Sequence, residues 1–172
     1  MAMEQGEIGW FSPDPRGVIP LDLFHQTKSL KRVVSSGKFE IRINSSFSEV
    51  IDGCAEREET WIDETVRESY ITLSSGGYAH SVETWFKGEL VGGLYGVSIG
   101  GAFFGESMFS REPNASKVAL VALVEHLRKR KFILLDTQWT TPHLRQFGAV
   151  DIPKNEYMKQ LNEAIKLNVS FI

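Results

Sequence analysis

The chain lacks the features that identify disulfide-rich, zinc-binding and membrane proteins. Its single cysteine, Cys54, cannot form an intramolecular disulfide, and no group of Cys and His residues has the spacing of a zinc site. No apolar run approaches the ~18 residues that span a bilayer, and the first residues do not resemble a signal peptide. We therefore expect a cytoplasmic protein with no metal site and no membrane contact.

The motifs of several large enzyme classes are missing as well. The sequence has no G-x-x-x-x-G-K-[ST] segment, which excludes a P-loop, and no G-x-S-x-G elbow, which leaves a serine hydrolase unsupported. Its four histidines form no H-x-x-x-H or H-E-x-x-H pattern. The formal net charge of −3 gives no global sign of nucleic-acid binding, so such binding would depend on a local basic patch.

What the chain does have is enough apolar sequence for a core. With 172 residues, 42% of them hydrophobic, it suits one domain or one domain with a small appendage. Three apolar strands in succession predict an antiparallel meander, and a buried helix then leads to a fourth apolar strand. The four strands are expected at 79–86, 89–98, 102–110 and 132–135, and the buried helix at 114–130. A further strand is expected at 38–43. Further helices are expected at 21–35, 46–57, 63–75, 141–147 and 153–167. The pattern predicts an α+β (mixed α/β) fold with a mostly antiparallel central sheet and one parallel crossover.

Glu106 is a carboxylate inside an apolar strand. Strict alternation would place Phe104, Glu106 and Met108 on one face. A buried charge costs several kcal/mol unless it is paired. The sequence leaves two partners open, an internal salt bridge or a cationic ligand beside an apolar pocket.

Asp136 and Gln138 follow the last apolar strand and lie two residues apart, so they are expected to point the same way. Ligand crevices form at the carboxyl ends of strands in open sheets. Asp136 is suited to orient the Gln138 amide, whose oxygen accepts from an amine, or alternatively to cap the next turn. Glutamine is a very weak base, so it positions a group and relays a proton instead of abstracting one alone.

The N-terminal part combines aromatic and basic residues. Trp10 and Arg16 belong to a proline-rich segment that is either a surface turn or a rigid platform. In the second case Trp10 offers a stacking face and Arg16 a bidentate partner for phosphate or carboxylate. The other basic residues of this part form either a solvated face or a phosphate-binding patch. They are Lys28, Lys31, Arg32, Lys38 and Arg42.

Several separate stretches, in the same order and spacing from Trp10 to about Tyr157, resemble the bacterial leucyl/phenylalanyl-tRNA–protein transferases. They are Trp10-Phe11-Ser12-Pro13-Asp14-Pro15-Arg16, Thr60-Trp61-Ile62, 77–83, 90–97, 104–110, 114–117, Leu135-Asp136-Thr137-Gln138 and Phe147-Gly148-Ala149. The resemblance implies a GNAT-like acyltransferase domain, residues 45–172, after a small N-terminal domain, residues 1–44, that is truncated relative to the family. It implies transfer of Leu or Phe, and also Met, from aminoacyl-tRNA to the N-terminal Arg or Lys of a protein, which marks that protein for the N-degron pathway.

The resemblance also implies roles for individual residues. Asp136 and Gln138 would form the catalytic relay, and Glu106 would hold the N-terminal region of the acceptor. Trp10 and Trp61 would contact the terminal adenosine of the tRNA, and Arg16 with the five basic residues named above would track its backbone. The pocket for the donor side chain would be lined by Leu94, Phe103, Met108, Leu120, Leu123, Leu127 and Leu135. The donor is aminoacyl-tRNA and no cofactor is expected.

The chain departs from the family pattern at Phe11, where a second Trp is usual, and at Trp139-Thr140-Thr141-Pro142. Leucines also replace bulkier residues of the pocket. Two other functions share the same features, a CoA-dependent N-acetyltransferase and a non-catalytic binder of basic N-termini. The first needs a glycine-containing pyrophosphate turn, which Arg111-Glu112-Pro113-Asn114 does not supply.

Overall fold

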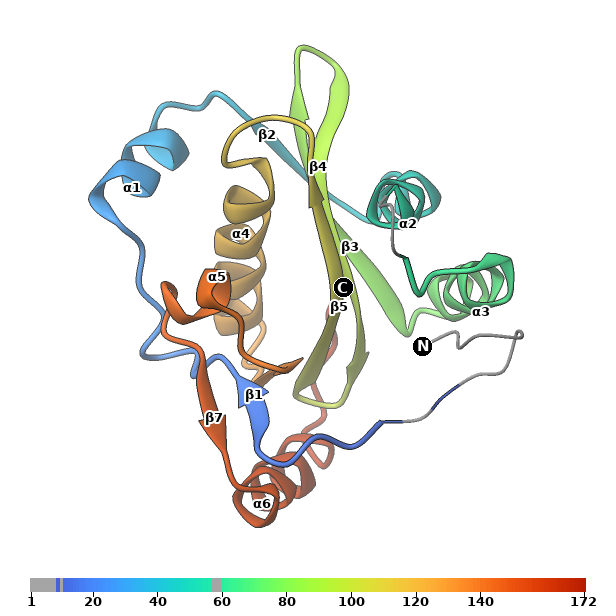
Figure 1. The fold of residues 1–172 in the computed structure, drawn as a ribbon, viewed down its shortest axis with the longest axis vertical. Helices are drawn as coiled ribbons and strands as arrows, with labels where there is room; N and C mark the ends of the chain where they lie inside the picture. The colour runs from blue at the N-terminus through green and yellow to red at the C-terminus, as the bar shows by residue number, and fades with distance from the viewer. Residues whose placement is uncertain (1–8, 10, 57–59) are drawn as a thin grey trace.

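The computed structural model of the chain describes residues 9, 11–56 and 60–172. A single mixed sheet forms the centre, with helices packed on both of its faces (Figure 1). The strands are β1 (Arg16–Val18), β2 (Glu40–Ile43), β3 (Ala79–Phe86), β4 (Glu89–Ile99), β5 (Ala102–Ser110), β6 (Leu134–Gln138) and β7 (Val150–Ile152). The helices are α1 (Lys28–Ser35), α2 (Phe47–Ala55), α3 (Glu64–Ser75), α4 (Ala115–Lys129), α5 (Pro142–Arg145) and α6 (Lys154–Ala164).

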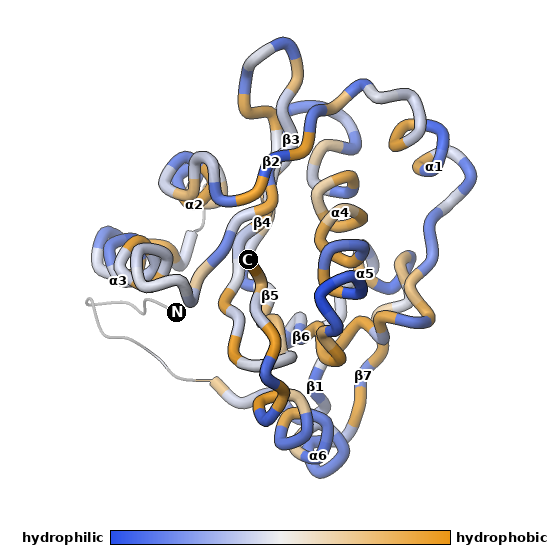
Figure 2. The backbone as a smooth tube through the Cα atoms, turned by 180° about the vertical axis from the view of Figure 1, so that it is seen from behind, coloured by the Kyte–Doolittle hydropathy of each residue, from blue (hydrophilic) through white to orange (hydrophobic). Residues whose placement is uncertain are grey.

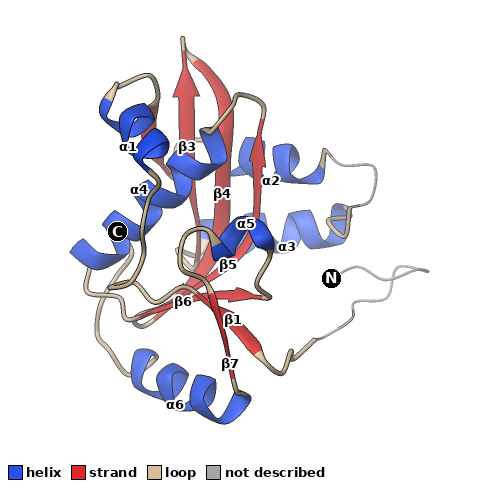
Figure 3. Ribbon diagram, turned by 60° about the vertical axis from the view of Figure 1, so that its left-hand side comes forward, coloured by secondary structure: helices blue, strands red, loops and turns tan. Residues whose placement is uncertain are grey.

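The sheet has seven strands in the order β2-β3-β4-β5-β6-β1-β7. Every neighbouring pair is antiparallel except β5 and β6, which run parallel and are joined through α4. Helix α4 covers one face together with α1 and α5, whereas α2 and α3 cover the other (Figures 1 and 3). The predicted α+β class, with a mostly antiparallel sheet and one helical crossover, is confirmed.

Helix α4 is the main helix of the core. Nine of its 15 residues are buried, so it has no wide solvent face, as its apolar sequence predicts. In Figure 2 the colouring of α4 is largely that of apolar residues, whereas α6 is mostly hydrophilic. On the other face of the sheet a second core forms where α2 and α3 meet β3, β4 and β5 around Tyr95 and Phe109. The sheet is therefore covered by a packed core on both faces.

Most predicted elements are confirmed, and the meander strands begin and end within one residue of the expected positions. The helix expected over 21–35 begins only at Lys28, because the Thr27 hydroxyl accepts a hydrogen bond from the Leu30 amide and caps it there. Leu23 and Phe24 suggested an earlier start, but both lie outside the helix, where Phe24 is buried and Leu23 is exposed. The short strands β1 and β7 were not predicted, since three residues carry too little alternation to be recognised.

The first 44 residues contribute strands β1 and β2 to the same sheet as the rest of the chain, one near each edge. Whether residues 1–44 form a domain of their own stays a prediction. Among the residues that the structure describes, no helix is both long and apolar enough to cross a membrane.

Candidate functional site

Two adjoining hollows lie at strand β6. Leu135 lines an apolar cavity, whereas Gln138 lines a more polar cleft. Asp136, between these two residues in the sequence, is buried. Three residues, Glu106, Thr137 and Trp139, line both hollows, so the two spaces meet at these residues.

The apolar cavity has a volume of about 510 Å³, within the range of small-molecule sites. Its wall is formed by residues of β4, β5, α4, β6 and the segment around α5. Five of the seven predicted pocket residues line it, Leu94, Met108, Leu120, Leu123 and Leu135. The wall is completed by Tyr95, Gly105, Glu106, Ser107, Thr137, Trp139, Thr141, His143 and Leu144.

The other two predicted pocket residues do not line the cavity. Phe103 and Leu127 are each 0% exposed and belong to the hydrophobic core behind its wall, where Phe103 stacks on Phe171 with ring centroids 5.2 Å apart. Helix α4 is apolar around most of its circumference, so its sequence could not tell which leucines face the cavity and which face the sheet. All three leucines belong to one hydrophobic core, and of these Leu120 and Leu123 also line the cavity, whereas Leu127 does not.

Glu106 lies at a β-bulge. Across the β4–β5 pair Tyr95 is opposite Ser107 and Gly96 is opposite Gly105, so Glu106 is the extra residue between two normal pairs. Bulges interrupt the strict alternation of side chains and redirect one of them. The predicted shared face of Phe104, Glu106 and Met108 is therefore broken at Glu106, whose carboxyl lies where the cavity and the cleft meet.

Among the described residues, the hydrogen-bond partners of the Glu106 carboxyl are neutral. Gln138 Nε2 donates to Glu106 Oε2 at 3.2 Å, and the Tyr70 hydroxyl of α3 forms a second hydrogen bond. Burial raises the pKa of Glu106, and these two hydrogen bonds oppose the rise. Within residues 9, 11–56 and 60–172, none of the ion pairs includes Glu106. Of the two partners that the sequence left open, an internal salt bridge is not found in this part of the chain.

Asp136 is completely buried and is held by residues distant in sequence. Arg16 Nε lies 3.0 Å from Asp136 Oδ1 and 3.2 Å from Oδ2, and Arg16 Nη2 lies 2.8 Å from Oδ2. The Tyr157 hydroxyl of α6 donates to the same Oδ2 at 2.6 Å. Burial and this hydrogen bond raise the pKa of Tyr157, so its hydroxyl stays protonated and donates. Burial lowers the pKa of Arg16, but the hydrogen bonds and charge of Asp136 outweigh it, and the net direction is upward.

Gln138 adopts a left-handed backbone conformation with φ of 63°, which is uncommon outside glycine. Its backbone N–H donates to Asp136 Oδ1 at 2.7 Å. Asp136 thus orients Gln138 through the main chain, and not through the side-chain amide as expected. The same hydrogen bond caps the turn after β6, which was the alternative role predicted for Asp136. Because Gln138 Nε2 is directed to Glu106, the amide oxygen is the atom left to accept from a ligand.

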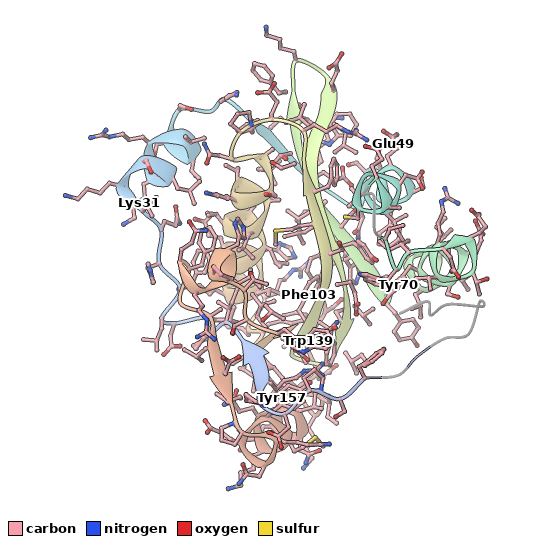
Figure 4. All side chains as sticks on the ribbon, viewed as in Figure 1. Lys31, Glu49, Tyr70, Phe103, Trp139 and Tyr157 are labelled. Atoms are coloured by element: carbon pink, nitrogen blue, oxygen red, sulfur yellow. The ribbon has the colours of Figure 1, made fainter. Side chains whose placement is uncertain are left out.

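The polar cleft, about 310 Å³ in volume, is rich in aromatic side chains. Trp61, predicted to contact adenosine, lines it together with Phe11, Tyr70 and Trp139, and Trp139 is 45% exposed. Figure 4 shows Tyr70 on α3 and Trp139 beside the end of the sheet. Trp10, the other predicted adenosine contact, lies outside the described residues. Flat exposed rings of this kind suit the stacking of a base.

The predicted tRNA-backbone residues are dispersed. Arg16 is part of the Asp136 network, Lys38 pairs with Glu112 at 2.9 Å, and Arg42 pairs with Glu40 at 2.7 Å. The remaining three, Lys28, Lys31 and Arg32, are exposed on α1, and Lys31 extends into solvent in Figure 4. A role of these residues in binding the tRNA backbone stays a prediction.

Three site residues were not recognised from the sequence. Tyr70 and Tyr157 each occupy an ordinary position in a predicted helix, and Tyr157 was interpreted only as part of an apolar face. Trp139 was noted only as a departure from a family pattern. No local signal marks them, because their roles arise from contacts across 36 residues for Tyr70 and Glu106 and across 21 residues for Tyr157 and Asp136.

A solved structure shares the fold at low sequence identity. The C-terminal DUF2156 domain of a protein from Agrobacterium fabrum superimposes with a TM-score of 0.51 at 9% identity, covering 88% of this chain and 52% of that one. This likeness concerns the fold alone.

The sequence comparisons are more specific. A protein from Rubrobacter xylanophilus named leucyl/phenylalanyl-tRNA–protein transferase is 53% identical over 99% of this chain and 90% of its own length. A protein of the same name from Herpetosiphon aurantiacus is 53% identical over 98% of this chain and 88% of its own length. The family model described as leucyl/phenylalanyl-tRNA protein transferase matches residues 18–162. The chain belongs to the leucyl/phenylalanyl-tRNA–protein transferase family and is an aminoacyltransferase.

Proposed function

We propose that this chain transfers a leucyl or phenylalanyl group, with methionyl as a further donor group, from aminoacyl-tRNA to the α-amine of a protein that begins with Arg or Lys. The observation that carries the proposal is the environment of Glu106. Its carboxyl lies at the mouth of an apolar cavity and has neutral partners, Tyr70 and Gln138, among the described residues. A cationic N-terminal residue would give this carboxyl a direct ion-pair partner, which none of the described residues supplies. By resemblance to the family, the product would enter the N-degron pathway.

The donor fits the two hollows together. A leucyl or phenylalanyl side chain would enter the apolar cavity, and the terminal adenosine would stack among the aromatic rings of the cleft. The ester bond between them would then lie where the hollows meet, beside Glu106 and Gln138. The cavity wall is mostly aliphatic and separates Leu, Phe and Met only weakly, since one methylene is worth about 1–3 kcal/mol.

The reaction needs positioning more than a strong base. The uncharged α-amine attacks the ester carbonyl, a C–N bond forms, the bond to the ribose oxygen breaks, and the amine proton ends on that oxygen. Gln138 Oε1 would accept a hydrogen bond from the amine, and Glu106 would hold the basic side chain of the same residue. Alignment of two bound reactants can supply about 7–11 kcal/mol of barrier lowering. The donor is cytoplasmic, so we place the protein in the cytoplasm.

The same site offers little to coenzyme A. Arg111, the basic residue between β5 and α4, pairs with Glu56 at 2.7 Å and donates to the Leu90 carbonyl at 3.2 Å. The Arg111 guanidinium therefore already has protein partners in the turn where an acetyltransferase would bind the pyrophosphate.

One incubation tests the function. The protein is mixed with charged leucyl-tRNA and an Arg-initiated peptide, and the peptide is analysed by mass spectrometry. We expect one added leucyl residue at the N terminus, no addition to the same peptide with an acetylated N terminus, and no product when acetyl-CoA replaces the tRNA. Acetylation from acetyl-CoA would establish the acetyltransferase instead, and peptide binding without turnover would establish a non-catalytic binder.

A further inference from the structure

Asp136 makes all of its contacts inside the protein. Its Oδ1 accepts from Arg16 Nε and from the Gln138 backbone, and its Oδ2 accepts from Arg16 Nε, Arg16 Nη2 and the Tyr157 hydroxyl. The side chain is 0% exposed. A carboxylate oxygen has about two lone-pair sites, so both oxygens are saturated. Neither a substrate amine nor its proton can reach this carboxyl without breaking these bonds.

The influence of Asp136 on the reaction must therefore pass through Gln138. The hydrogen bond from the Gln138 N–H holds a left-handed backbone conformation, which costs a non-glycine residue about 1–2 kcal/mol. That conformation places the Gln138 amide 3.2 Å from Glu106. If Asp136 were released, this backbone would relax and the amide would leave the junction of the two hollows.

We propose that Arg16 and Tyr157 are positioning residues of the transfer reaction, which fix Asp136 so that Asp136 fixes Gln138. The proposal rests on the proposed function. Arg16 comes from β1 and Tyr157 from α6, and the Arg16 guanidinium lies over the Tyr157 ring, 5.0 Å from its centroid. Arg16 balances the charge of the carboxyl with a planar two-point contact, and the Tyr157 hydroxyl fixes Oδ2 from α6.

Further contacts hold the segments that carry Arg16 and Tyr157 in place relative to the turn after β6. In the sheet Gly17 pairs with Gln138, and a Cβ at Gly17 would lie 2.5 Å from the Trp139 carbonyl carbon. Glycine is thus required for β1 to approach the 138–140 turn this closely. At the other side, Asp14 Oδ1 accepts from the Lys154 amide at 3.2 Å, which ties the start of α6 to the chain just before β1.

Tyr157→Phe is the sharpest test, because it removes one hydroxyl and preserves the packing of the ring. We expect kcat to fall about 10- to 100-fold, as for loss of a hydrogen bond to a charged group, with KM for tRNA and for peptide unchanged within about 2-fold. The matched control is Tyr78→Phe, since the Tyr78 side chain is exposed and lines neither hollow, and we expect it to keep wild-type kinetics. Arg16→Lys retains the charge but loses the two-point contact, and should also lower kcat more than it changes KM.

The double variant Tyr157→Phe/Gln138→Ala distinguishes a positioning role of Tyr157 from a purely structural one. If Tyr157 acts through Gln138, Tyr157→Phe causes no further loss in a Gln138→Ala background, because residues that act as a unit are strongly non-additive. An equal fractional loss in both backgrounds would overturn the proposal.

Hydrogen exchange of the Gln138 backbone amide gives a measurement that does not depend on turnover. Its protection should fall in Tyr157→Phe and stay unchanged in Tyr78→Phe, with thermal unfolding showing that both variants are folded. Unchanged protection in Tyr157→Phe would contradict the positioning role. Absence of transfer by the wild-type protein would instead reject the proposed function, and the exchange result would still decide whether Tyr157 controls Gln138.

Discussion

The half-buried carboxyl of Glu106 gives the most direct test of acceptor recognition. Glu106→Gln keeps the shape of the side chain and can still meet Tyr70 and Gln138, but it removes the negative charge. A hydrogen bond to a charged group contributes about 1.5–3 kcal/mol, so we expect kcat/KM for an Arg-initiated peptide to fall about 10- to 150-fold. Affinity for charged tRNA should not change, because the apolar cavity and the aromatic cleft are intact.

The assay compares two peptides that differ only in charge, one beginning with Arg and one with citrulline. The wild-type protein should prefer Arg by about the same factor that the variant loses, whereas Glu106→Gln should distinguish the two by less than about 3-fold. Glu112→Gln is the control, since Glu112 is exposed and pairs with Lys38 away from the site. If Glu106→Gln lowers transfer to both peptides equally, the carboxyl is not the seat of the cation.

The same substitution has an expected effect on stability. Burial raises the pKa of Glu106, so its ionised form is less favourable in the folded than in the unfolded protein. This destabilisation develops as the pH rises from the ordinary Glu pKa through the raised one, and is complete above it. Glu106→Gln should therefore raise the melting temperature at pH 7, with the difference shrinking towards acid pH. A lower melting temperature at pH 7 would show that the charge has a partner in the free protein.

Three further changes test other parts of the molecule. Leu120→Ala enlarges the donor cavity and should shift the ratio of Leu to Phe transfer towards Phe by about 10-fold. Leu127 lies behind the cavity wall, so Leu127→Ala should leave that ratio unchanged. It should instead lower the free energy of unfolding in urea by about 2–5 kcal/mol. Burial lowers the pKa of His80 to about 4, so stability should fall by about 2 kcal/mol as the pH drops from about 6.5 to 4, and much less in His80→Gln; an identical acid profile would exclude His80 as the cause. Gly17→Ala should reduce kcat at least about 10-fold in single-turnover assays while the circular dichroism spectrum is kept, and full activity would show that the 138–140 turn tolerates displacement.

The sheet was predictable because its central strands carry their own signals. The meander from Ala79 to Ser110 alternates and turns at glycines, and α4 is apolar enough to be recognised as buried. Strands β1 and β7 are held by pairing and not by local propensity, so the sequence could not show them. The start of α4 also depends on a contact from outside the helix, since the Asn114 side chain makes no capping hydrogen bond and the Ser110 hydroxyl accepts from the Ser116 amide at 3.2 Å.

In the candidate site, residue types were easier to predict than their contacts. Glu106, Asp136 and Gln138 attract notice because polar groups in apolar strands need partners, and the structure brings Glu106 and Gln138 together. The bulge at Glu106 and the link from Arg16 to Asp136, 120 residues apart, depend on the assembled sheet. The structure links Asp136 to Gln138 through the Gln138 main chain, and a catalytic relay of the two residues stays a prediction.

The meeting of the two hollows beside Glu106 has a kinetic consequence. The donor would fill both hollows while its ester stays at their junction beside the acceptor carboxyl, so neither substrate would have to leave before the other arrives. The enzyme need not store the aminoacyl group on one of its own side chains. Initial rates measured at several fixed concentrations of one substrate should accordingly give double-reciprocal lines that intersect, the signature of a ternary complex, instead of the parallel lines of a substituted-enzyme mechanism.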